Sequence, residues 1–105
     1  MEILHETLST GARLVGYLRE PAAEMPAFAT RPAMLIFPGG GYGYCSKREA
    51  DPVAMQFLQA GYQTFVLEYT CAHTPEQAPL RWQPLIDAAG AILHLRRNAA
   101  KLRLD

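Results

Sequence analysis

The sequence predicts an α/β fold built on a mixed sheet, and three observations carry this prediction. Hydrophobic residues make up 50% of the chain and charged residues 19%, which is enough apolar material for a core. Short apolar runs typical of strands alternate with segments of helical periodicity. A glycine-rich segment joins one such strand to a helix, as in many α/β proteins. A chain of 105 residues is expected to form one domain, residues 1–105, and no second one.

The amino-terminal third of the chain predicts an antiparallel hairpin followed by a loop. Residues 2–8 and 12–19 each alternate between apolar and polar side chains, and Ser-Thr-Gly at 9–11 separates them as a turn does. Residues 20–32 are rich in proline and alanine, a composition typical of a loop that crosses the sheet without joining it.

Two later segments predict a parallel pair of strands. Residues 33–37 are continuously apolar, which is typical of a strand buried on both faces. Residues 62–69 are rich in β-branched and aromatic side chains and directly follow a predicted helix. A strand, a helix and a strand in this order predict a right-handed crossover between parallel neighbours.

The helix between these strands has two candidate starts. Ser46 with Glu49 fits a capping box, and Asp-Pro at 51–52 fits an N-cap followed by a first-turn proline. We expect a first turn near residue 47 and regular helix over 52–60, because Gly61 is placed for a left-handed C-terminal cap. The predicted apolar stripe comprises Val53, Phe57 and Ala60.

A second helix is predicted after a loop at residues 70–79. Its residues 98–101 close the helix, and residues 102–105 lead toward a further strand. Basic side chains near its end complement the helix dipole and do not indicate a nucleic-acid site. The predicted stripe comprises Trp82, Leu85, Ile86, Ala89, Leu93 and Arg97.

The segment Pro-Gly-Gly-Gly-Tyr-Gly-Tyr at residues 38–44, called the glycine loop below, is hard to explain by packing. Adjacent glycines cost more backbone entropy than a core requires, and they permit close approach to the backbone. A loop between a strand end and a helix start presents N–H groups to an anion, either a phosphate or a developing oxyanion. The nucleotide motifs GxxxxGK[ST] and GxGxxG are both absent. A glycine-rich turn without a ligand is the plain structural alternative.

Several spaced motifs together resemble one family. They are Pro-Gly-Gly-Gly-Tyr at 38–42, Ser46, residues 48–54, Gly-Tyr at 61–62 and residues 65–69. They are similar to the front portion of α/β-hydrolase esterases, specifically the bacterial acetylesterase and acetyl xylan esterase-like group. The resemblance covers residues 33–105. It implies a truncated α/β-hydrolase fold with the first four strands and two helices, a mixed sheet and an open edge at the third strand.

The resemblance also implies roles for three residues. In the family this loop supplies oxyanion-hole N–H groups, which here would come from Gly40 and Gly41. Tyr42 would line the acyl or alcohol pocket, or alternatively would be a partly buried aromatic that holds the loop against the helix. No cofactor is implied.

The nucleophile motif GxSxG of this family does not occur in the chain. The two serines, Ser9 and Ser46, are better explained by turn and capping duties. We therefore interpret the chain as the amino-terminal fragment of a serine carboxylic ester hydrolase, without its own Ser-Asp-His triad. The alternative is a non-catalytic or split-protein interaction piece that pairs through the open sheet edge.

Charge and cysteine content bound the partners. Ten basic residues balance ten acidic ones, so we expect neither nucleic-acid nor membrane binding. The expected partners are a small acylated substrate, if the rest of the domain is present, and a carboxyl-terminal half or a second copy. The amino terminus lacks signal-peptide character, which indicates a cytoplasmic chain. Cys45 and Cys71 are expected to be free thiols; a nucleophilic Cys45 with a lowered pKa, or a zinc site, is disfavoured.

Overall fold

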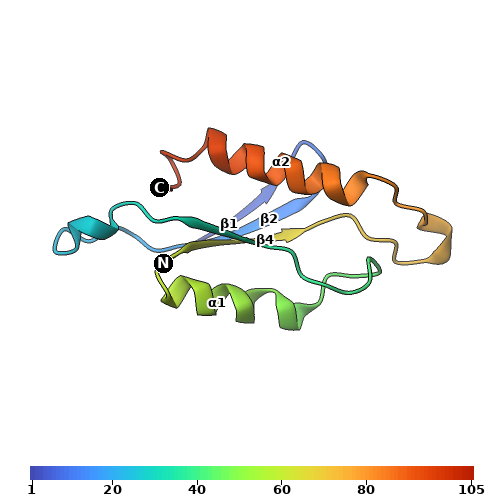
Figure 1. The fold of residues 1–105 in the computed structure, drawn as a ribbon, viewed down its shortest axis with the longest axis horizontal. Coiled ribbons are helices and arrows are strands. Elements are labelled where there is room, and N and C mark those ends of the chain that lie inside the picture. Colours follow the sequence, from blue (N-terminus) through green and yellow to red (C-terminus); the bar gives the residue numbers. More distant parts are fainter.

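A computed structural model describes all residues, 1–105, as one four-stranded sheet with a helix on each face (Figure 1). The strand order is β1-β2-β4-β3. The strands are β1 (Glu2–Thr7), β2 (Arg13–Leu18), β3 (Ala33–Ile36) and β4 (Gln63–Glu68), and the helices are α1 (Asp51–Gln59) and α2 (Gln83–Arg97). The predicted α/β class with a mixed sheet is confirmed.

Both predicted strand pairings are present. β1 and β2 form an antiparallel hairpin, closed by the Leu8 amide, which donates to the Ala12 carbonyl at 2.8 Å. β2 also pairs antiparallel with β4, so that Val15 lies opposite Val66. β3 pairs parallel with β4, with Leu35 opposite Phe65. Strand β4 therefore lies between β2 and β3 and pairs with both of them.

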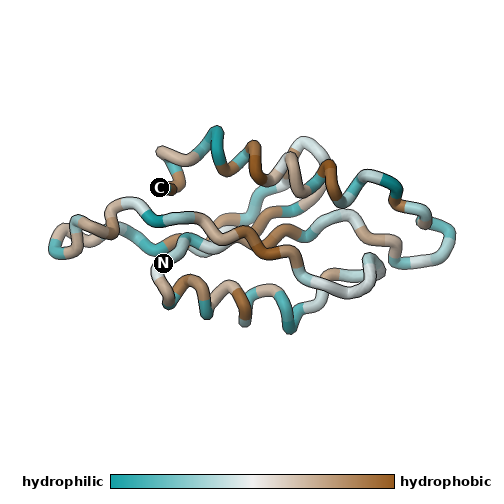
Figure 2. The backbone as a smooth tube through the Cα atoms, viewed as in Figure 1, coloured by the Kyte–Doolittle hydropathy of each residue, from teal (hydrophilic) through white to brown (hydrophobic).

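Two hydrophobic clusters fill the space between the sheet and its helices. The smaller one, under α1, joins Ile36, Ala54 and Val66. In Figure 2 the strands in the middle of the molecule carry much of the hydrophobic colour, while the loops are mostly hydrophilic or neutral. The larger cluster, under α2, comprises Leu8, Ala12, Leu14, Leu18, Phe65, Leu67, Ala91, Leu95 and Leu102.

Helix α1 begins at Asp51 and ends at Gln59, within one residue of the prediction. Gly61 has a φ of +109°, as a left-handed C-terminal cap requires. The predicted caps are wrong, because neither the Ser46 nor the Asp51 side chain caps a helix. Residue 46 is instead buried, and its amide donates to the Gly39 carbonyl at 2.8 Å. The fully buried face comprises Ala54 and Leu58, and Val53 and Phe57 pack at its margin.

Helix α2 is rotated relative to the predicted stripe. Its buried residues are Asp87, Ala91 and Leu95, whereas Leu85 is 64% exposed. The predicted stripe is therefore wrong, because a buried carboxylate tethers the helix to the end of β4 and turns an apolar side outward. The exposed apolar side chains on or next to this helix are Trp82, Leu85, Ile86, Ile92 and Leu93.

Strand β3 is an edge strand, as the resemblance implied. It pairs only with β4, so Ile36 alone is fully buried and Phe37, just beyond its end, is 47% exposed. The expectation of burial on both faces is wrong for this chain, because no neighbouring strand covers the outer side. Two residues before β3 begins, Arg31 forms an isolated parallel bridge with Leu104. Neither helix is long and apolar enough to cross a membrane.

Candidate functional site

The glycine loop leaves the carboxyl end of β3 and lies beside residues 69–72, called the strand-end segment, which follow β4 (Figure 1). Two hydrogen bonds join them: the Tyr69 hydroxyl donates to the Pro38 carbonyl, and the Ala72 amide donates to the Tyr42 carbonyl at 2.8 Å. Because parallel strands end at the same edge of a sheet, these segments meet where ligands of α/β proteins usually bind.

The backbone of the glycine loop uses conformations that favour glycine. The φ angles are +153° at Gly40, +62° at Gly41 and +64° at Tyr42. A Cβ at position 40 would lie 2.1 Å from the Tyr44 carbonyl oxygen, whereas a Cβ at position 41 would meet no atom within 4 Å. Glycine is thus required at position 40 for space as well as for dihedral angle.

The amides of Gly40, Gly41 and Tyr42 donate no hydrogen bond within the protein. By contrast, the Gly43 amide closes the turn by donating to the Gly40 carbonyl at 3.1 Å. Successive free N–H groups in left-handed backbone form a concave donor set that suits an anion or an oxyanion. The loop therefore offers unpartnered donors at the positions that the resemblance singled out.

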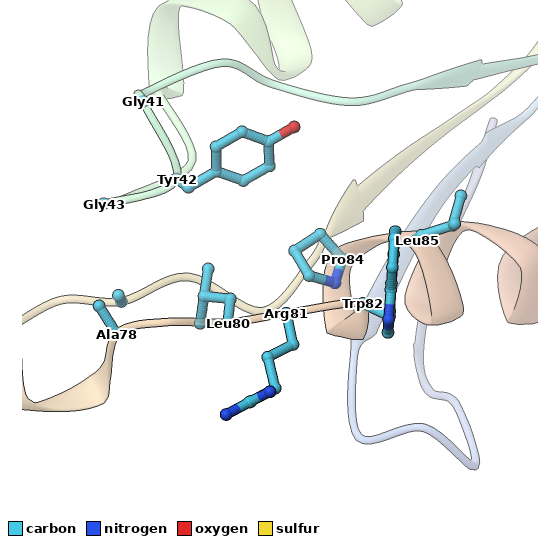
Figure 3. Close-up of a pocket in the computed structure, with 10 residues that line it drawn as sticks. Gly41, Tyr42, Gly43, Ala78, Leu80, Arg81, Trp82, Pro84 and Leu85 are labelled. Carbon is cyan, nitrogen blue, oxygen red and sulfur yellow. The ribbon is translucent and has the colours of Figure 1, made fainter.

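A cavity of about 510 Å³ opens beside these donors (Figure 3). Gly41 and Tyr42 form one wall, and Trp82 and Leu85, at the start of α2, form another. The Tyr42 side chain is 60% exposed, and its ring meets Tyr69 edge-on with 6.1 Å between centroids. Tyr42 therefore lines the cavity and rests on the strand-end segment, and its proposed roles stay predictions.

Asp87 is a buried residue that the sequence interpretation missed. Its Oδ2 accepts from the Thr70 amide at 2.7 Å, and its Oδ1 accepts from Nε2 of Gln83 at 2.9 Å. Burial raises the pKa of this carboxyl, but the hydrogen bonds from Thr70 and Gln83 prevail, so its pKa lies below the usual value. A lone carboxylate among apolar residues of a helix was the available signal.

The two cysteines meet beside the glycine loop. The Sγ atoms of Cys45 and Cys71 are 3.8 Å apart and both thiols are free. Burial, followed by the hydrogen bond with Cys71, raises the pKa of the Cys45 thiol to about 11. A nucleophilic Cys45 with a lowered pKa is therefore contradicted.

No catalytic serine and histidine come together in this chain. The His94 imidazole contacts the Glu6 carboxylate directly, and both line a small cavity that includes no residue of the glycine loop. His73 is exposed, and Ser46 is buried beneath the loop. No group of three or more His, Cys, Asp or Glu side chains is arranged to hold a metal ion.

The fold and the glycine loop match α/β-hydrolase structures. An α/β-hydrolase enzyme from a Medee basin deep-sea metagenome library is 40% identical, with a TM-score of 0.83, over 98% of this chain and 43% of that one. An acetyl ester-xyloside bifunctional hydrolase from Caldicellulosiruptor lactoaceticus is 30% identical, with a TM-score of 0.75, over 90% of this chain and 31% of that one. The chain corresponds to the amino-terminal portion of an α/β-hydrolase esterase.

One curated protein is also similar to the chain at the level of sequence. Endo-1,4-beta-xylanase B of Butyrivibrio fibrisolvens is 43% identical over 75 residues, which are 71% of this chain and 12% of that protein. No family model matches the chain. The chain spans under half of the structures it matches, and a small part of this relative.

Proposed function

We propose that this chain supplies the oxyanion-hole loop of a serine carboxylic ester hydrolase of the acetylesterase type. The observation that carries the proposal is the pair of unpartnered amides at Gly40 and Gly41 beside an open, largely apolar cavity. The nucleophile, the acid and the base must come from polypeptide outside residues 1–105, since the chain contains no GxSxG. Residues 1–105 are then the amino-terminal part of one hydrolase domain, and this part lacks the nucleophile elbow.

The proposed role of the amides is electrostatic. A tetrahedral intermediate places negative charge on the former carbonyl oxygen, and N–H dipoles that are already aimed at that oxygen stabilise it without reorganising. Gly41 is exposed and lines the cavity, and Gly40, the half-buried residue before it, would contribute the neighbouring amide. Each such donor typically contributes about 3–4 kcal/mol to transition-state stabilisation.

The proposed substrates are small acylated molecules. A cavity of about 510 Å³ fits a short acyl chain with a modest alcohol, and Tyr42 and Trp82 offer aromatic surface to it. One similar protein is named as an acetyl ester-xyloside bifunctional hydrolase, and another is named as an endo-1,4-beta-xylanase. These names favour acetylated sugars among the substrates.

A chimera tests the proposal. Residues 1–105 are joined to the part of the deep-sea hydrolase that lies beyond the matched region, and hydrolysis of an aryl acetate is measured. Ligation at Cys45 allows residues 1–44 to be synthetic, so glycolic acid can replace Gly41 and remove only its N–H group. We expect kcat to fall about 10²–10³-fold with a smaller change in KM.

The control is the same ester at Gly11, whose amide donates to the Leu8 carbonyl in the hairpin turn and which does not line this cavity. Equal kcat values for the Gly41 and Gly11 esters, in chimeras with the same circular dichroism, contradict the oxyanion role. Residues 1–105 alone should show no turnover above that of an inert protein, because they lack a nucleophile.

A second candidate function rests on the edge of the sheet. β3 pairs on one side only, and the exposed Phe37 lies just beyond its end. Unpaired backbone groups on an apolar edge favour the addition of another strand. The partner would be a carboxyl-terminal half or a second copy of the chain. Binding of a separately produced carboxyl-terminal half, without any esterase activity, would favour this function over the first.

A further inference from the structure

The Cys45 and Cys71 thiols are placed for a reaction with each other. Their Sγ atoms lie 3.8 Å apart although 26 positions separate the residues. A disulfide bond is about 2 Å long, so the sulfur atoms need to approach by less than 2 Å. Both sulfurs also point at one acceptor, the Tyr69 carbonyl, at 3.9 Å from Cys45 and 3.5 Å from Cys71. The backbone thus already brings both side chains to one place.

The pair is open to a small molecule. Both cysteines line an open cavity of about 460 Å³, distinct from the one beside the free amides. Cys45 is half-buried and Cys71 is 8% exposed, so a reagent in this cavity reaches Cys45 first. Arg13, Lys47, Glu68 and His73 also line the cavity, so its two permanent cations outnumber its one carboxylate. Cationic Lys47 favours the approach of an anionic reagent.

We propose that Cys45 and Cys71 form a redox pair that a small anionic disulfide, of the glutathione disulfide class, converts to an intramolecular disulfide. Because burial raises the pKa of the Cys45 thiol to about 11, the exchange needs alkaline pH; there the Cys45 thiolate attacks one sulfur of the reagent, forms a mixed disulfide and releases one small thiolate. The Cys71 thiolate then attacks the Cys45 sulfur and releases the second. The protein loses two electrons and two protons, and the reagent is reduced to two thiols.

The bond would tether the glycine loop. Cys45 directly follows that loop, and Cys71 lies in the strand-end segment to which the loop is otherwise joined by hydrogen bonds such as Ala72 N–H to Tyr42 O. A covalent link at this point limits how far the two segments can separate, and so restrains the Gly40 and Gly41 amides. The inference concerns the chain's own chemistry and stands whether or not the loop serves an esterase.

The test uses the whole chain at low concentration with glutathione disulfide at alkaline pH, where part of the Cys45 thiol is ionised, followed by alkylation and mass spectrometry. We expect a monomer lighter by two hydrogen atoms, a peptide that links Cys45 to Cys71, and full reversal by a dithiol reductant. Cys71→Ser should stop at a stable mixed disulfide on Cys45, and Cys45→Ser should react little because Cys71 is buried.

Hydrogen exchange then measures whether the disulfide restrains the glycine loop. Amides 40–44 of the oxidised protein should exchange several-fold more slowly than those of the reduced protein, and the Cys45→Ser variant should show no response to the reagent. A mixed disulfide at Cys45 that never closes in the unmodified sequence, or cross-links only between chains, would overturn the redox pair. Closure without any change in exchange would overturn the tether.

Discussion

At the scale of single residues, the backbone requires glycine at position 40 but not at position 41. Gly40 and Gly41 both have positive φ, but only at Gly40 would a Cβ collide with backbone, 2.1 Å from the Tyr44 carbonyl oxygen. The loop can accept an alanine at position 41 by straining a dihedral angle. An alanine at position 40 forces the loop to change its conformation.

Gly40→Ala should therefore destabilise the chain by more than Gly41→Ala. A left-handed alanine costs about 1–2 kcal/mol, which is the whole expected effect at position 41. At position 40 the displaced turn adds to that cost and also moves the free amides. Urea unfolding of the two variants checks the order, and equal losses of stability would contradict the close approach of position 40 to the Tyr44 carbonyl.

Asp87 makes the stability depend on pH. The carboxyl has a pKa below its usual value, so its contribution is present above the pKa of the unfolded chain and is lost as the pH falls through the folded pKa. Asp87→Asn should destabilise the protein by about 1–3 kcal/mol at pH 7, because one of the Thr70 and Gln83 donors loses its acceptor.

The difference between Asp87→Asn and the unmodified protein should shrink below about pH 4, where the unfolded carboxyl is protonated. Glu76→Gln is the control, because this carboxylate is exposed in a surface turn. A difference that stays constant from pH 7 to pH 3 would show that the carboxylate is not the group responsible.

At the scale of elements, α2 shows how one polar contact decides which face of a helix is buried. The helix offers apolar residues on more than one side, and the contact between Asp87 and Thr70 places Leu95 in the core and leaves Leu93 exposed. The amphipathic pattern alone had predicted that Leu93 faces the core.

The paired variants Leu95→Ala and Leu93→Gln test this rotation. We expect Leu95→Ala to cost about 2–5 kcal/mol, because it opens a cavity in the core under α2. Leu93→Gln should change stability by no more than about 0.5 kcal/mol, because its side chain is already in water. Thermal unfolding of both variants is sufficient, and a larger loss for Leu93→Gln would restore the stripe predicted from sequence.

At the scale of the whole molecule, the isolated chain exposes an apolar edge and an apolar helix face. Phe37 stands just beyond the edge strand β3, and Ile3 stands on β1 at the opposite edge with a similar exposure, 47% against 50%. Both β1 and β3 are unpaired on their outer sides, and Phe37, just beyond β3, shares a cavity with the exposed Leu85 of α2.

We expect residues 1–105 to self-associate through the β3 edge. Phe37→Lys should shift sedimentation toward the monomer, whereas Ile3→Lys should have little effect. A monomer at high concentration without either change would count against the edge as an interface. A larger shift toward the monomer for Ile3→Lys than for Phe37→Lys would indicate that β1 forms the interface.

The sequence by itself determined the order and type of the elements. Alternation marked β1 and β2, a continuous apolar run marked β3, and Gly61 marked the end of α1, because these signals act between neighbours in the chain. The resemblance carried by several spaced motifs together likewise predicted the α/β-hydrolase fold. The roles assigned to Gly40, Gly41 and Tyr42 stay predictions.

Only the tertiary structure decided which surfaces meet. The rotation of α2, the buried Asp87 and the contact of Cys45 with Cys71 all depend on residues 17 to 26 positions apart. No local pattern encodes such a distance, because it arises when β3 and β4 end at the same edge of the sheet. The free amides and the thiol pair come together there because parallel pairing aligns those strand ends.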